Sequence, residues 1–78
     1  MKEVTTVILE NGLEYMELDE IIYDNNKYIL LVNYNNVKDF CIRRIKVSDN
    51  QEYFVKIIDE IEYDKVLNLF VKKNKALF

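Results

Sequence analysis

The residues best suited to chemistry in this chain are two acidic clusters, at residues 17–20 and 59–62. General acid–base catalysis needs a carboxylate buried in a cleft, so that its pKa rises. One glycine, no proline and no long loop give the chain little with which to build a cleft. A hard-cation site at Glu17, Asp19 and Glu20 is conceivable, but the spacing matches no calcium loop and lacks the turn glycine of such loops. Solvated acids are the simpler interpretation, and we predict no catalytic or metal site.

Cysteine and histidine chemistry is equally restricted. The single Cys41 has no histidine anywhere in the chain to activate it. Arg43 and Arg44 could lower the pKa of its thiol, yet a cysteine between Phe40 and Ile42 on a strand is more typical of a small buried hydrophobe. The lack of histidine also excludes most zinc and haem sites and most catalytic triads. We therefore expect a protein without a cofactor and without enzymatic activity.

A basic strand segment is the one local departure from an otherwise acidic chain. Arg43 and Arg44 are followed by Lys46, and arginine on a strand can pair bidentately with a carboxylate or phosphate of a partner. The alternative is pairing within the chain, with Glu52 or other acids of the neighbouring strand. We take Arg43, Arg44 and Lys46, together with Tyr34 in the preceding loop, as candidate partner-binding residues.

The charge distribution limits the class of partner. The net charge is −3, but residues 1–70 hold fourteen acidic and eight basic side chains, whereas the last eight residues hold three lysines and no acid. An acidic body disfavours direct binding to duplex nucleic acid, because phosphate contacts supply most of that affinity. The terminal lysines suit the end of a helix. Tyrosines interleaved with acids favour protein contacts.

The N-terminal residues and the length of the apolar runs indicate where the protein is located. The N-terminal residues do not have the basic and apolar pattern of a secretory signal. The longest apolar run, residues 28–32, is too short to span a bilayer. We expect a cytoplasmic protein that does not enter a membrane.

Alternating apolar residues predict five antiparallel strands joined by short turns rich in asparagine and aspartate. The strands are expected at about residues 3–9, 13–23, 28–34, 39–47 and 52–58. Asn11-Gly12 predicts a type I′ hairpin turn, and residues 33–38 predict a looser connection. A change of alternation at Leu18–Glu20 predicts a β-bulge.

The helical period begins after the last strand. Asp59 is suited to the N-cap, and Glu62 is placed to return a hydrogen bond to it as in a capping box. Apolar residues then recur at helical spacing, which predicts an amphipathic helix over residues 60–73. The stripe consists of Tyr63, Val66, Leu67 and Phe70. We predict one α+β domain over residues 1–78, a five-stranded antiparallel β-meander, curled or half-barrel, with this helix packed on one face.

The order of these motifs resembles the YrzB-like family of small bacterial proteins, a domain of unknown function. The resemblance rests on residues 8–12, 14–19 and 26–31, then on Cys41-Ile42-Arg43 and a final acidic helix. It implies a cytoplasmic bacterial protein and supplies no activity. Members are usually more acidic, whereas this chain adds Arg44, Lys46 and a lysine tail.

Two functions fit these observations. The first is a non-enzymatic interaction module that binds a protein partner, or a second copy of itself, through the uncovered sheet face or an exposed edge strand. Charge reversal of Arg43 and Arg44 should then abolish association. The alternative is a small acidic inhibitor or nucleic-acid mimic from a mobile element, which blocks a DNA- or RNA-binding enzyme. A net charge of only −3 with a cationic tail fits that alternative poorly.

Overall fold

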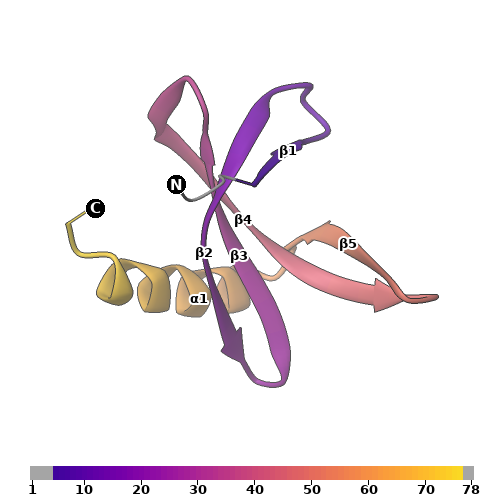
Figure 1. Cartoon of the computed structure of the whole chain (residues 1–78). Coiled ribbons are helices and arrows are strands. Elements are labelled where there is room, and N and C mark those ends of the chain that lie inside the picture. The colour runs from indigo at the N-terminus through magenta and orange to yellow at the C-terminus, as the bar shows by residue number, and fades with distance from the viewer. Residues whose placement is uncertain (1–4, 77–78) are drawn as a thin grey trace.

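Five strands and one C-terminal helix make up the fold (Figure 1). The computed structural model describes residues 5–76, apart from the side chain of Val37. The elements are β1 (Thr6–Ile8), β2 (Glu14–Tyr23), β3 (Asn26–Asn33), β4 (Asn36–Ser48), β5 (Gln51–Lys56) and α1 (Glu60–Lys73). The strands form one antiparallel sheet in the order β1-β2-β3-β4-β5, which curls into a half-barrel. The predicted α+β meander is confirmed.

Two of the turns are tight two-residue hairpins made without glycine. Asp24 and Asn25 have φ angles of 52° and 63°, and Asp49 and Asn50 have φ angles of 51° and 62°. Positive φ at both central positions defines a type I′ turn, whose twist matches that of the strands it joins. Aspartate and asparagine adopt this region more readily than other side chains, so these short polar pairs can close the hairpins.

The prediction of a type I′ turn at Asn11-Gly12 is wrong. Of the two residues only Gly12 has a positive φ, of 79°. Its N–H donates to the carbonyl of Leu9, and the side chain of Asn11 accepts from the N–H of Leu13. This is the wider hairpin in which a turn is followed by one left-handed residue. The connection at residues 33–38 is irregular, in line with the expected looser connection. Asn33 pairs with Asn36, but the register then shifts and the next pair is Val32 with Phe40, so residues 37–39 have no ladder partner on β3.

The predicted bulge in the second strand is confirmed. The register of β2 against β3 shifts between Glu17 and Asp19, so Leu18 has no partner on β3. A bulge bends its strand and increases the local twist. This bend carries the N-terminal part of β2, and β1 with it, out of the plane of the central strands (Figure 1).

The central strand β3 is buried on both faces, and each face carries its own apolar cluster. The helix face holds Tyr28, Leu30 and Ile42, packed against Val66 and Phe70 of α1. The opposite face, called the inner face below, buries a second cluster, consisting of Leu9, Tyr15, Ile29 and Leu31. The curl of the sheet covers this cluster, because Val7 of β1 and Phe54 of β5 pack against it.

The helix begins and ends as predicted, at Glu60 and Lys73. Asp59 is the N-cap, and its carboxylate accepts from the N–H groups of Ile61 and Glu62. Val66 and Phe70 of the predicted stripe are fully buried. The predicted return bond from Glu62 is replaced by tertiary contacts, because its carboxylate accepts from Tyr28 and Arg44. No helix among residues 5–76 is long and apolar enough to cross a membrane.

Both outer strands are shorter than predicted. Residues 3 and 4 of the first predicted strand lie outside the described residues, and β1 covers only Thr6–Ile8. β5 ends at Lys56 and not at residue 58. Ile57 packs against the helix-face cluster, whereas Ile58 is 90% exposed.

Candidate functional site

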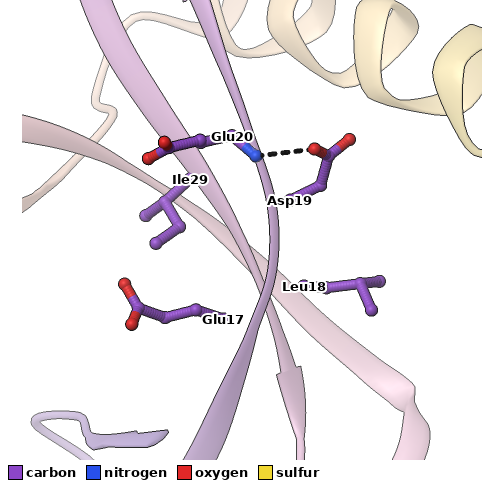
Figure 2. Close-up of a pocket in the computed structure, with 5 residues that line it drawn as sticks. All are labelled: Glu17, Leu18, Asp19, Glu20 and Ile29. Carbon is purple, nitrogen blue, oxygen red and sulfur yellow. Dashed lines mark hydrogen bonds between the residues drawn. The ribbon is translucent and has the colours of Figure 1, made fainter. Parts of the chain in front are cut away.

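The acidic cluster at the bend of β2 does not converge on a common point. Figure 2 shows Glu17 and Glu20 on one side of the strand with Ile29, and Leu18 and Asp19 on the other. The carboxylate of Asp19 accepts hydrogen bonds from Lys73 Nζ (2.9 Å) and Asn74 Nδ2 (3.0 Å). Partial burial opposes its ionisation, but these donors outweigh it and lower the pKa of Asp19. Within the described part of the chain no three side chains of the metal-ligating types come together.

Arg43 lies on the inner face and joins two hairpins. Its Nη2 is 2.6 Å from Glu10 Oε1 in the turn between β1 and β2, and its side chain is only 13% exposed. Lys56 of β5 reaches the same carboxylate at 3.2 Å. A hydrogen bond from its own backbone N–H and those from Lys56 and Arg43 lower the pKa of Glu10 to about 2. Glu10 therefore fastens the β1–β2 hairpin over the inner face of β4 and β5.

Arg44 lies on the helix face, next to the start of α1. Its Nη1 is 3.2 Å from Glu62 Oε2, the oxygen that also accepts from the Tyr28 hydroxyl. Burial, with the neighbouring Glu62 carboxylate, raises the pKa of Tyr28 to about 12, so this hydroxyl remains a donor at neutral pH. Both arginines are thus paired within the chain. The acids are Glu10 and Glu62, whereas Glu52, the partner we had considered, contacts Lys27 at 3.9 Å.

The other two predicted site residues lie at opposite ends of β4. Tyr34 is 56% exposed in the turn before β4, and Lys46 is exposed near the turn after it, opposite Tyr53 of β5. The structure therefore does not bring the four predicted residues into one surface. Burial raises the pKa of the Cys41 thiol beside the inner-face cluster, and this effect exceeds that of the nearby Arg43. A thiol in that state is a poor nucleophile.

The edges of the sheet present unpaired backbone groups, and hydrogen-bond alternation identifies them. In a two-residue hairpin the residues that flank the turn form a hydrogen-bonded pair, and hydrogen-bonded pairs alternate with non-bonded pairs along the strands. Tyr23 and Asn26 flank the second turn, so Ile22 and Glu20 direct their N–H and C=O groups away from β3. Ser48 and Gln51 flank the fourth turn. The residues of β5 that direct these groups away from β4 are therefore Glu52, Phe54 and Lys56.

The outer edge of β2 is capped by side chains. The N–H of Glu20 donates to Asp19 Oδ1 at 2.9 Å, and the carbonyl of Glu20 accepts from Lys73 Nζ at 3.1 Å. Both outward groups of this residue are therefore satisfied by the strand itself and by the end of α1. Further along, the N–H of Glu17 donates to the carbonyl of Thr5. Ile22, 78% exposed, has no such cap among residues 5–76, and neither have the outward residues Thr6 and Ile8 of the short strand β1.

The outer edge of β5 has no such cap. Within the described residues, no backbone or side-chain group is hydrogen-bonded to the outward N–H and C=O groups of Glu52, Phe54 and Lys56. We expected an exposed edge strand as a possible binding element, but the residue pattern alone did not single out these three residues. The meander order makes the last strand an edge, and the Asp49-Asn50 turn determines which of its residues face outward, so both signals were present in the sequence.

Comparison of the chain with protein-family models, curated proteins and solved structures finds no match. The likeness to the YrzB-like family therefore stays a prediction.

Proposed function

We propose that this protein is a non-enzymatic interaction module that binds an extended segment of a protein partner along the outer edge of β5. The observation that carries this proposal is the contrast between the capped edge of β2 and the uncapped edge of β5. A strand added there becomes the sixth strand of the sheet, which is the common mode of β-strand addition.

The β5 edge has the properties that strand addition requires. Its three outward residues offer three N–H donors and three C=O acceptors in one line, and each hydrogen bond formed there contributes about 0.5–1.5 kcal/mol net. Phe54 on the inner face and Val55 on the helix face are partly buried, so the strand is held from both sides. Tyr53 is 47% exposed and offers an aromatic ring to the side chains of an added strand.

The predicted binding residues have different roles in this proposal. Lys46 lies directly beside Tyr53 and extends the binding surface onto β4. Arg43 supports the site indirectly and does not contact the partner. Its pairing with Glu10 holds the β1–β2 hairpin over the inner face on which Phe54 packs. Arg44 similarly ties α1 to β4 through Glu62. Tyr34 lies at the far end of the sheet and is not part of the proposed site.

The alternative function as a nucleic-acid mimic receives less support. A mimic needs a continuous stripe of unpaired acids in place of the phosphates. Here several acids form ion pairs with bases within the chain: Glu20 with Lys27, Glu10 with Arg43 and Lys56, Asp19 with Lys73, and Glu62 with Arg44.

A selection experiment tests the proposed function. A displayed library of extended peptides is selected against the chain at a dilution where it is monomeric, and the selected peptides are retested on Lys56→Pro. Proline at residue 56 removes an outward N–H without removing a bond to β4, and edge strands tolerate proline in this position. Lys56→Ala is the matched control. The proposal requires peptides that bind the wild type and Lys56→Ala but lose at least tenfold in affinity for Lys56→Pro. Equal binding to all three proteins, or no binding at all, would contradict it.

A further inference from the structure

The sequence of β5 complements itself when two copies run antiparallel. The outward residues are Glu52, Phe54 and Lys56, an acid, an aromatic residue and a base at equal spacing. A twofold axis through Phe54 places Glu52 opposite Lys56 of the second copy, Phe54 opposite Phe54, and Lys56 opposite Glu52. We infer that the partner segment at this edge is β5 of a second copy, which yields a symmetric dimer with a continuous ten-stranded sheet. This inference rests on the proposed function.

Hydrogen bonding selects this register. Each pair of outward residues exchanges two backbone hydrogen bonds in an antiparallel ladder. Only the axis through Phe54 brings all three outward residues of each copy into such pairs. A shift by two residues in either direction leaves one outward residue of each copy without a partner on β5. A parallel arrangement would place Glu52 beside Glu52 and Lys56 beside Lys56, and like charges directly opposite are destabilising.

The side chains agree with the same register. Glu52 and Lys56 keep 57% and 66% of their side chains exposed, so both can reach a partner. The contact of Glu52 with Lys27 is long, at 3.9 Å, and Lys56 shares Glu10 with Arg43. On the helix face, Tyr53 lies opposite Val55 of the second copy, an aromatic and β-branched pair of the kind that stabilises cross-strand contacts. The same patch on both subunits is what a twofold interface requires.

The proposed β5–β5 interface is small, and its small area limits the affinity of the dimer. Six residues of one strand bury less than the roughly 1,600 Å² of a standard protein interface, so the dimer is expected to be weak. We expect a dissociation constant on the order of 0.1–1 mM, which makes the state of the protein dependent on its concentration.

Charge reversal with rescue tests this dimer in the full-length chain. Sedimentation equilibrium up to millimolar concentration measures association of the wild type, Glu52→Lys and Lys56→Glu. Each single reversal creates two like-charged pairs across the axis, and association should weaken at least tenfold. A one-to-one mixture of the two variants restores opposite charges in both pairs and should associate as the wild type does. Glu14→Lys and Lys38→Glu, which reverse exposed charges on other strands, are the matched controls and should associate normally.

The outcomes separate the dimer from the proposed function. A wild type that stays monomeric at millimolar concentration overturns the dimer, whereas the peptide selection can still succeed on β5. Association that both reversals leave unchanged places the interface elsewhere and also overturns it. Circular dichroism of each variant excludes unfolding as the cause of a loss, and restoration in the mixture is a result that misfolded variants cannot produce.

Discussion

The part of β2 that β1 leaves uncovered and the outer edge of β5 differ in how their outward backbone groups are satisfied. On β2, Glu20 is capped by Asp19 on its N–H and by Lys73 on its carbonyl. On β5, the outward groups of three residues remain open among residues 5–76, with charged side chains only at Glu52 and Lys56. Proteins usually cover or charge a strand edge to prevent uncontrolled pairing. The end of the helix thus caps one residue of β2, whereas β5 keeps a row of open groups, at which we propose that a further strand adds.

The largest effect is expected from proline substitution on β5, which tests which amides face inward. Val55 pairs with Arg44 as a hydrogen-bonded pair, so Val55→Pro removes a bond of the sheet and should destabilise the fold by about 3 kcal/mol or more. Lys56→Pro removes only an outward N–H and should cost about 1 kcal/mol or less. Urea denaturation of both variants measures the difference. Equal destabilisation would show that the inward and outward residues of β5 are assigned incorrectly.

The next largest effect concerns the cap on β2. Asp19→Ala removes the acceptor of Lys73, Asn74 and the Glu20 N–H, and should destabilise the fold by about 1–3 kcal/mol. It also uncovers the edge of β2 beside the exposed Ile22. We expect the variant to gain an association that Glu52→Lys does not abolish, measured by sedimentation of the double variant. An Asp19→Ala protein that associates only through β5 would indicate that the cap has no protective role.

A smaller effect is expected from substitution of Arg43 and Arg44. From the sequence alone, either residue could bind a partner or pair with an acid within the chain. Arg43→Gln and Arg44→Gln each remove an ion pair within the chain and should lower stability by about 1 kcal/mol. Because neither side chain belongs to the β5 edge, the dissociation constant should change less than threefold. If the unfolding free energy were unchanged and association weakened tenfold, both arginines would have to contact the partner directly.

The smallest effect is the pH dependence that arises from Glu10. Its pKa of about 2 in the folded chain lies below the ordinary value of 4.5, so the carboxylate stabilises the fold fully above pH 4.5. That contribution is lost as the pH falls from 4.5 toward 2. Glu10→Gln should therefore flatten the dependence of the unfolding free energy on pH in this window, measured by urea denaturation at several pH values. An unchanged slope would exclude a role for Glu10 in fastening the β1–β2 hairpin.

Local signals in the sequence predicted most of the fold. The strand order, the bulge near Leu18 and both ends of α1 follow from alternation, a break in alternation and an N-cap, which act over a few residues. Glu62 did not follow its local signal, because Tyr28 and Arg44, more than fifteen residues away in the chain, bind its carboxylate instead. The cap on β2 joins Asp19 to Lys73, and no spacing in a single sequence reveals such a contact.

The proposed site differs in position from the residues that the sequence suggested. We expected an exposed edge strand as one possible binding element, but we chose the basic residues of β4 as the candidate binding residues. Arg43 and Arg44 alternate on a strand and so lie on opposite faces, and each meets an acid brought from another element by the curl of the sheet and by α1. The complementarity of Glu52, Phe54 and Lys56 is visible in the sequence once the outward residues of β5 are known.

Residue-resolved amide hydrogen exchange tests the central claim most directly, because it compares the two edges in one sample. In dilute protein the N–H of Glu20 should exchange slowly, while those of Glu52, Phe54 and Lys56 exchange as fast as that of Ile22. At millimolar concentration the three β5 amides should become protected at least tenfold and Ile22 should not. Protection of the β5 amides in dilute protein, or their continued fast exchange at every concentration, would contradict an open edge that accepts a second copy.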